Sequence, residues 1–259
     1  MNPSAPGLLN LAAYHFAPIA HPTPVAAALR TQAQALGIKG TVLVTSEGLN
    51  AFWAAPEAEA QAMLQALRDV PGFAALKAKA SWSAACPFKR LKVKVKREMI
   101  RMNHPAIQPG QGRAPSVDAA TLQRWLDQGH DDQGRPVRML DTRNAFEVAH
   151  GQFAGATHWG LGQFTEFPQA AQQHGHELAP YTVVSYCTGG IRCEKAALYM
   201  HTLGLTNVWQ LEGGILEYLE RTNGKHWQGN CFVFDERGTL NAELAPAASS
   251  ANLANQVQS

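Results

Sequence analysis

The chain has 259 residues, 46% of them hydrophobic, and a formal net charge of +2. This length fits one large or two ordinary domains with a sizeable core. No apolar run is long enough to cross a bilayer, the first residues lack the basic stretch of a secretory signal, and four scattered cysteines do not form a disulfide framework. We therefore expect a cytoplasmic protein without membrane contact, in a reducing compartment where a reactive thiol is stable.

Charge divides the sequence into two parts of opposite sign. Residues 1–113 carry 13 Lys and Arg against 5 Asp and Glu, a balance of +8, whereas residues 114–259 carry 9 against 15, a balance of −6. Opposite balances indicate two domains with different tasks, and the basic part is the candidate for binding an anionic partner. The expected domain boundaries are 1–102 for the basic domain, 103–115 for a linker rich in Pro and Gly, 116–225 for a second domain, and 226–259 for a final strand and flexible tail.

The basic part has the pattern of a small α/β sandwich. Apolar alternation and helical periodicity predict, in chain order, strand 11–16, helix 24–36, strand 40–46, strand 50–54, helix 57–69, strand 76–82 and strand 91–97. A turn at 46–50 joins the two middle strands. The order strand, helix, strand, strand, helix, strand is that of a ferredoxin-like (βαββαβ) domain.

The segment 88–101 closes this part and concentrates its charge. Seven of its fourteen residues are basic and one is acidic, and lysines alternate with Leu91, Val93 and Val95. In a strand this alternation places the lysines on one face, where they suit a phosphate backbone. An edge strand protected from aggregation by its lysines is the alternative, and no RNA-stacking aromatic signature accompanies the charge. The candidate RNA-binding residues are Lys89, Arg90, Lys92, Lys94, Lys96 and Arg97.

After the linker, strands alternate with helices. The predicted elements are helix 116–128 with Ser116 as cap, strand 137–140, helix 144–149, a turn at 151–155, helix 163–174, strand 182–186, helix 194–203, strand 207–210, helix 215–221 and a last strand at 232–234. No structure is assigned from Asn241 onward. This alternation implies a parallel sheet covered by helices, in which reactive groups lie at the carboxyl ends of strands. Asp141 and Cys187 both fall at such ends.

The loop that follows strand 182–186 carries the chemistry. Its sequence Cys-Thr-Gly-Gly-Ile-Arg-Cys surrounds one sulfur with inward-turned N–H groups, the start of a helix and a guanidinium group, all of which favour the thiolate. The alternative is a buried structural cysteine in an ordinary turn. The candidate catalytic residues are Cys187, Arg192 and Cys193, and the loop between them consists of Thr188, Gly189, Gly190 and Ile191.

Two readings stay open for the neighbouring residues. Asp141, Arg143 and Glu147 either support the chemistry or form a salt-bridged brace of the loop. Cys193 either resolves an oxidised Cys187 or packs as a small buried residue. No group of His and carboxylate residues has the spacing of a metal site, so none is expected.

Several motifs appear in the order typical of the rhodanese domain. Asp141-Thr-Arg143, Glu147, Gly155-Ala-Thr-His158, the cysteine loop and Leu211-Glu-Gly-Gly214 resemble that domain over about residues 114–225. In it, the cysteine carries a persulfide or otherwise acts as nucleophile. Phosphatase-type loops of this kind place arginine six positions after the cysteine, whereas here Arg192 lies five after, and the shorter loop fits a sulfur-sized group better than a phosphate.

Taken over about residues 10–238, the sequence resembles the bacterial rhodanese-domain tRNA uridine hydroxylases. The motifs that carry this resemblance are Glu47-Gly-Leu-Asn50, the basic segment, the cysteine loop and Gly229–Arg237. It implies oxygen-dependent 5-hydroxylation of the wobble uridine, with tRNA as partner, molecular oxygen as co-substrate and no recognisable cofactor. Longer relatives carry a cysteine-rich C-terminal extension that is not found here. A plain sulfurtransferase and a non-catalytic RNA-binding module remain the alternatives; protein partners and oligomeric state are not predicted.

Overall fold

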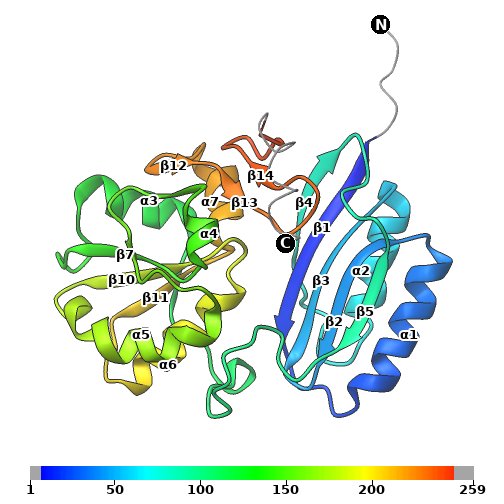
Figure 1. Ribbon diagram of the computed structural model, residues 1–259, viewed down its shortest axis with the longest axis horizontal. Helices are drawn as coiled ribbons and strands as arrows, with labels where there is room; N and C mark the ends of the chain where they lie inside the picture. Colours follow the sequence, from blue (N-terminus) through cyan, green and yellow to red (C-terminus); the bar gives the residue numbers. More distant parts are fainter. Residues whose placement is uncertain (1–6, 248–259) are drawn as a thin grey trace, which may run out of the picture. The chain divides into compact units, whose positions relative to one another are not determined.

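Two compact units, residues 1–99 and residues 100–259, make up the chain in the computed structural model (Figure 1). Residues 7–247 are described, and residues 1–6 and 248–259 lie outside the description. The first unit contains, in order, β1 (Leu8–Phe16), α1 (Pro22–Ala35), β2 (Lys39–Thr45), β3 (Gly48–Ala55), α2 (Glu57–Arg68), β4 (Ala78–Ser83) and β5 (Leu91–Val95). The predicted α/β order of this unit is confirmed.

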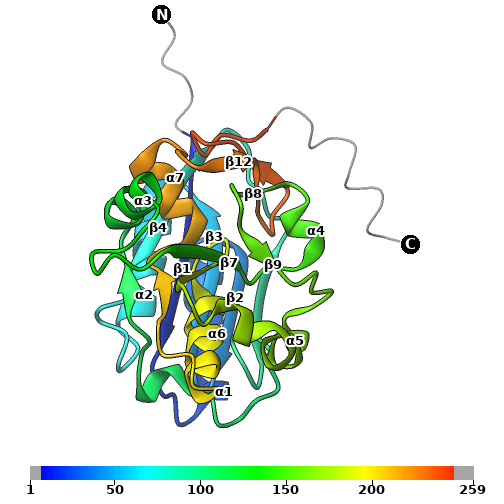
Figure 2. The same cartoon turned by 90° about the vertical axis from the view of Figure 1, so that its left-hand side faces the viewer.

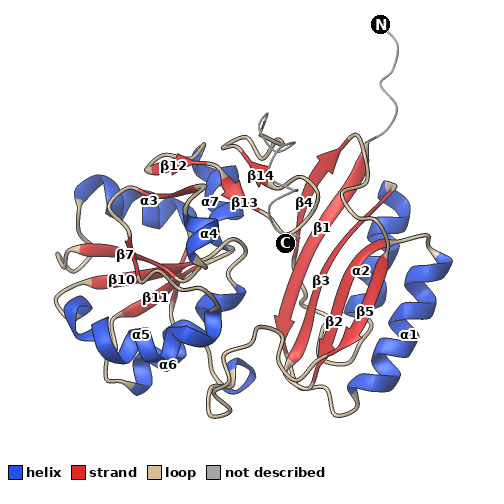
Figure 3. Cartoon of the chain, in the orientation of Figure 1, coloured by secondary structure: helices blue, strands red, loops and turns tan. Residues whose placement is uncertain are grey.

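A five-stranded sheet in the order β4-β1-β3-β2-β5 forms the first unit. Its neighbours are antiparallel except for β2 and β5, which run parallel, so β5 extends the ferredoxin-like sheet at its edge. Both helices cover one face of the sheet (Figures 1 and 3). Alternate strand residues such as Leu11, Val42 and Trp53 pack against them, and the Trp53 indole donates a hydrogen bond to the Ala60 carbonyl of α2 at 3.1 Å. The opposite face of the sheet carries no helix of this unit.

The second unit is built around a parallel sheet in the order β6-β11-β10-β7-β9. Two-stranded sheets, β12 with β8 and β13 with β14, lie outside it. In chain order the elements are η1 (Pro109–Gln111), β6 (Ser116–Val117), α3 (Ala119–Gln128), β7 (Val137–Asp141), α4 (Ala145–Val148), β8 (Gly151–Phe153), β9 (Thr157–His158), η2 (Phe164–Glu166), α5 (Phe167–His174), η3 (Gly175–Leu178), β10 (Thr182–Tyr186), α6 (Ile191–Thr202), β11 (Val208–Leu211), α7 (Gly214–Thr222), β12 (Trp227–Gly229), β13 (Cys231–Phe232) and β14 (Thr239–Leu240).

Helices cover both faces of this sheet, as predicted. The pair α3 and α7 lies on one side and the pair α5 and α6 on the other (Figures 1 and 2). Successive strand residues point to opposite sides, so Val184 joins the core under α3 and α7 while Val183 joins the core under α5 and α6. None of the described helices has the length and hydropathy of a membrane span.

Some predicted boundaries are wrong for local reasons. Ser116 does not cap the first helix of the second unit, because it pairs with Gln210 in the sheet. Asp118 is the cap, and its carboxylate accepts hydrogen bonds from the N–H groups of Ala120 and Thr121, both at 2.9 Å. The predicted turn at 151–155 begins with strand β8, which pairs with β12, a strand that was not predicted.

The segments flanking the second sheet are partly ordered. Residues 103–115, predicted as a linker, contain η1 and contribute Ile107 and Ala114 to the core under α5 and α6. The predicted strand at 232–234 is replaced by β13, which ends at Phe232. The described part of the predicted tail forms a turn, in which the Asn241 N–H donates to the Ala245 carbonyl at 2.9 Å. The remainder of that tail lies outside the described residues.

Candidate active site and nucleic-acid interface

The sheet register brings the predicted site residues of the second unit together. Strands β7 and β10 are neighbours, and their last residues Asp141 and Tyr186 are paired. The segments that follow them therefore leave the same carboxyl edge of the sheet side by side. One segment carries Arg143 and Glu147, and the other is the cysteine loop.

Backbone donors hold the cysteine loop from two directions. The Gly190 N–H donates to the Cys187 Sγ at 3.1 Å, and Gly190 adopts φ +98°, a conformation that glycine reaches without strain. From α7, the N–H groups of Ile215 and Leu216 donate to the carbonyls of Cys187 and Thr188 at 3.0 and 3.2 Å. A Cβ at Gly214 would lie 2.4 Å from the Cys187 carbonyl oxygen, so a glycine at the start of α7 allows this close approach.

The environment of Cys187 favours the thiolate. The residue is 1% exposed, and burial alone raises the pKa of its thiol. The hydrogen bond from the Cys193 thiol, the charge of Arg192 and the N–H groups of Arg192 and Gly190 outweigh burial and lower the pKa to about 5. Helix α6 begins at Ile191, three residues before the predicted start, so Arg192 and Cys193 lie in its first turn. A thiolate at neutral pH is the reactive form of the group.

Glu147 holds Arg192 in place. The two guanidinium nitrogens of Arg192 donate to the Glu147 carboxylate at 2.6 and 2.7 Å, and both side chains are almost fully buried. The pair is bidentate, which fixes the plane of the guanidinium group. Glu147 also accepts from the Asn144 N–H at 3.1 Å. Glu147 therefore links the loop after β7 to the cysteine loop.

Replacing Glu147 with Gln should lower the free energy of unfolding by about 3–5 kcal/mol, because it removes the carboxylate that pairs with the buried Arg192 charge. Urea denaturation measures this loss. The matched control is Asp132→Asn, which breaks the exposed pair Arg124–Asp132 and should leave the unfolding transition unchanged. Equal stability of the Glu147 variant and the wild type would contradict the argument.

Asp141 and Arg143 form a second buried pair. The Arg143 Nε and Nη2 atoms donate to the Asp141 carboxylate at 2.9 and 2.6 Å, and Nη2 also donates to the Gly151 carbonyl at 2.6 Å. The guanidinium lies 5.4 Å from the ring centroid of Trp227. All of these contacts are to residues of the second unit itself, so Asp141 and Arg143 form a salt-bridged brace of the loop after β7.

The Cys193 thiol lies in the first turn of α6 and interacts with Cys187. Burial, followed by the hydrogen bond and charge of Cys187, raises the pKa of the Cys193 thiol well above its ordinary value. A thiol that keeps its proton stabilises the neighbouring thiolate but is a poor nucleophile. The Thr142 hydroxyl lies 3.8 Å from the Cys193 Sγ and donates to the Tyr186 carbonyl at 2.9 Å. The sequence alone does not reveal Thr142 as a neighbour of Cys193, because its position is set only when β7 and β10 pair.

Two substitutions separate the readings of Cys193. Cys193→Ser keeps a hydrogen-bond donor but cannot form a disulfide, whereas Cys193→Ala removes both properties. A hydrogen bond to a charged group contributes about 1.5–3 kcal/mol. Cys193→Ala should therefore raise the pKa of Cys187 by roughly one to two pH units, whereas Cys193→Ser should leave that pKa near its wild-type value. Ultraviolet absorbance of the thiolate against pH measures this, with Cys187→Ser as the blank. Equal loss of activity in both variants would instead support a resolving cysteine.

The open side of the loop consists of its central residues. Thr188, Gly189 and Ile191 are half-buried, and a Cβ at Gly189 would meet no atom within 4 Å. The Thr188 hydroxyl donates to the Phe232 carbonyl at 3.3 Å. Among residues 7–247, no three His, Cys, Asp or Glu side chains gather closely enough to hold a metal ion.

The predicted RNA-binding residues lie in the first unit and are all exposed. They are Lys89, Arg90, Lys92, Lys94, Lys96 and Arg97. Strand β5 lies at the edge of its sheet, and Arg30 of α1 donates to the Val93 carbonyl at 2.8 Å. The apolar face is less complete than expected, because Val93 is 6% exposed whereas Val95 is 45% exposed.

The lysines of β5 continue a row of residues across the helix-free face of the sheet. Register places Lys92 beside Thr41, Thr41 beside Phe52, and Phe52 beside Ala12. Phe52 is 38% exposed, and the described strand residues on this face include no Asp or Glu. An exposed aromatic ring, which the sequence pattern did not place near the basic strand, therefore lies on β3 on the same face as these lysines. Alternation alone could not reveal it, because its distance from β5 depends on the strand order.

Two family models and many curated proteins match this chain. Residues 8–99 match the UPF0176 acylphosphatase like domain, and residues 118–221 match the rhodanese-like domain. A protein of Bordetella petrii called tRNA uridine(34) hydroxylase is 56% identical, with 96% of this chain and 99% of that protein covered. A protein of the same name from Variovorax paradoxus is 54% identical, with 95% and 93% covered. Among solved structures, the human single domain sulfurtransferase TSTD1 is 27% identical at a TM-score of 0.33, covering 42% of this chain and 97% of that one.

Proposed function

The chain belongs to the family of tRNA uridine(34) hydroxylases, and from that premise we propose that it hydroxylates carbon 5 of the wobble uridine in tRNA. The chain is thus an enzyme, an oxidoreductase that takes tRNA as substrate and molecular oxygen as co-substrate. The observation that supports this most directly is the Cys187 thiol, whose pKa is lowered to about 5 inside a loop held by backbone donors. Because tRNA is its substrate, we place the protein in the cytoplasm.

The two units of the chain have different tasks in this reaction. Cys187 is the reactive thiolate, and Arg192 and the Gly190 N–H stabilise negative charge on its sulfur. Glu147 positions Arg192. In the first unit, the exposed lysines of β5 bind RNA phosphates, because ammonium groups in a row along an edge strand match the charge of a nucleic-acid backbone.

A rhodanese-type sulfurtransferase remains the second candidate, and one observation favours it. Arg192 follows Cys187 by five positions, and the loop closes tightly around a single sulfur atom, with the Gly190 N–H at 3.1 Å. Such a cradle suits a persulfide as well as a thiolate. The two reactions differ in product, since one adds oxygen to the base and the other transfers sulfur to an acceptor.

Mass spectrometry of tRNA nucleosides from a strain lacking the gene distinguishes these candidates. We expect 5-hydroxyuridine and the nucleosides made from it to disappear and to return when the wild-type chain is supplied. Loss of a thiolated nucleoside with 5-hydroxyuridine unchanged would favour the sulfurtransferase. An unchanged nucleoside profile would exclude both reactions on tRNA.

A further inference from the structure

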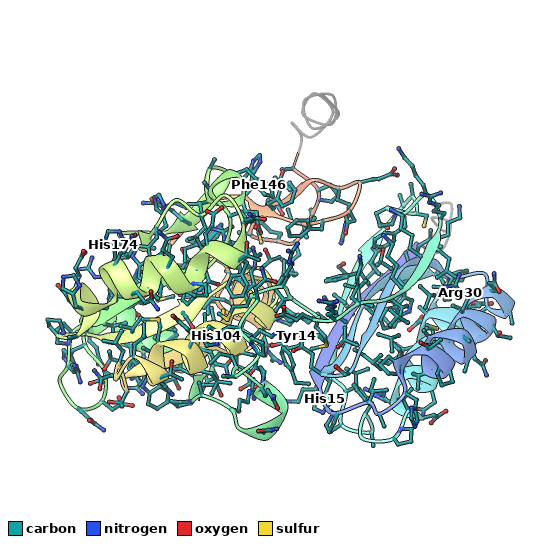
Figure 4. All side chains as sticks on the ribbon, turned by 60° about the horizontal axis from the view of Figure 1, so that its bottom comes forward. Tyr14, His15, Arg30, His104, Phe146 and His174 are labelled. Atoms are coloured by element: carbon teal, nitrogen blue, oxygen red, sulfur yellow. The ribbon has the colours of Figure 1, made fainter. Side chains whose placement is uncertain are left out.

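Three phenylalanines of the second unit form an exposed aromatic cluster: Phe146, Phe232 and Phe234. Phe146 is 48% exposed and Phe234 is 62% exposed, and Phe232 between them is half-buried. Large aromatic side chains usually contribute to cores, so rings held this far into solvent indicate a binding surface. Figure 4 shows Phe146 beside the C-terminal segment that carries the other two rings.

The rings of the aromatic cluster hold one another edge to face. Ring centroids of Phe146 and Phe232 lie 5.2 Å apart at 89°, and those of Phe232 and Phe234 lie 5.2 Å apart at 86°. His150 stacks on Phe232 at 5.5 Å and 24°. Edge-to-face packing orders the rings, while about half of the surface of Phe146 and more of that of Phe234 stays exposed to a ligand. The cluster is therefore a preformed aromatic surface.

Both chain segments that present these rings are tied to the cysteine loop. Phe146 directly precedes Glu147, whose carboxylate binds Arg192 at 2.6 and 2.7 Å. The Phe232 carbonyl accepts a hydrogen bond from the Thr188 hydroxyl, one residue after Cys187, at 3.3 Å. The aromatic cluster thus borders the open side of the loop. Cys187 itself is only 1% exposed, so its sulfur is shielded from direct contact with a protein surface.

We propose that the aromatic cluster stacks the uracil base of the substrate and so holds it beside Cys187; this inference rests on the proposed function. The substrate uridine lies in the single-stranded anticodon loop, and proteins bind unpaired bases by stacking them on aromatic side chains. Stacking on an aromatic ring needs no charged group beside the base. The charges next to the cluster are consistent with this, because the Asp235 carboxylate is paired with Arg237 at 2.6 Å. The phosphate contacts come from the lysines of β5.

Anisotropy of a labelled anticodon stem-loop tests this assignment with the full chain. One hairpin carries uridine at the wobble position, and a second is abasic there. We expect the wild type to bind the uridine hairpin about tenfold more tightly or better, which is the range of a single base stacked on an aromatic ring. Phe146→Ala combined with Phe234→Ala should bind both hairpins alike, at the affinity of the abasic hairpin.

Further variants separate stacking from general hydrophobic contact. Phe234→Trp keeps a ring and should keep the preference for uridine, whereas Phe234→Leu keeps apolar volume without a ring and should lose most of it. The Leu variant also serves if the double Ala variant does not fold. Leu203→Ala is the control, because Leu203 is 39% exposed and follows α6 at the end remote from Cys187.

Each outcome has one meaning. A double variant that still prefers the uridine hairpin overturns the stacking site. A wild-type dimer that dissociates in the double variant during sedimentation also overturns it, because the rings would then bind a second copy. If the wild type restores 5-hydroxyuridine in a deletion strain but shows no preference for the uridine hairpin, the stacking site alone fails. If the wild type restores none, the proposed function fails first.

Discussion

Replacing Cys187 with Ser should abolish 5-hydroxyuridine formation while the chain still folds. The hydroxyl of serine remains protonated at neutral pH, whereas the Cys187 thiol has its pKa lowered to about 5 and is a thiolate there. The Gly190 N–H can still donate to the serine oxygen, and the loop carbonyls keep their donors from α7. Mass spectrometry of tRNA nucleosides, from a deletion strain supplied with the variant, measures the loss, and thermal unfolding checks the fold.

Cys86→Ser is the control for this substitution. Cys86 is a half-buried free cysteine of the first unit, and its only described sulfur contact is to the Phe88 carbonyl at 3.4 Å. The Cys86 variant should restore wild-type levels of 5-hydroxyuridine. If the Cys187 variant did so too, Cys187 would not be the reactive group, and the tight loop around it would have only a structural role.

The cysteine loop could be predicted from sequence because its signals are local. The apolar strand 182–186, the double glycine and Arg192 follow one another directly, and each points to the same strand, loop and helix arrangement. Asp141 also lies at the carboxyl end of a parallel strand, so the sequence predicted that it lies beside the cysteine loop. The helix start was wrong by three residues, because Gly190 in the left-handed conformation turns the chain into the helix at once.

Contacts between distant segments could not be predicted in the same way. Gly214 lies against the Cys187 carbonyl only because α7 packs against the loop. Phe234 is 62% exposed although the sequence pattern placed it in a strand with Phe232, and β13 in fact ends at Phe232. Phe52 joins Lys92 in one row through two strand pairings, and neither is visible in the local pattern. The residue types of the cysteine loop thus predicted a reactive thiolate, whereas the strand order and helix packing determine which residues surround it.

Replacing Lys92, Lys94 and Lys96 together with Gln should weaken tRNA binding by about a hundredfold or more at low salt. Each lysine that neutralises a phosphate contributes about 0.7–0.9 to the slope of log affinity against log salt, so three should lower that slope by about 2–3. Folding should survive, because all three side chains are exposed and Val93, which anchors β5 to the core, is unchanged. Filter binding of tRNA across a salt series measures both quantities.

A matched triple variant makes this test specific to β5. Arg124, Arg221 and Lys225 are exposed residues of the second unit, and changing them to Gln removes the same charge without touching the sheet of the first unit. If tRNA were attracted only by the overall charge of the chain, both triple variants would show the same loss of tRNA affinity and the same decrease in salt slope. We expect the loss in the β5 variant alone, because a row of ammonium groups on one strand contacts successive phosphates, whereas scattered charges act only at a distance that salt screens. An unchanged salt slope in the β5 variant would mean that its lysines merely protect an edge strand, and that tRNA binds to another surface of the chain.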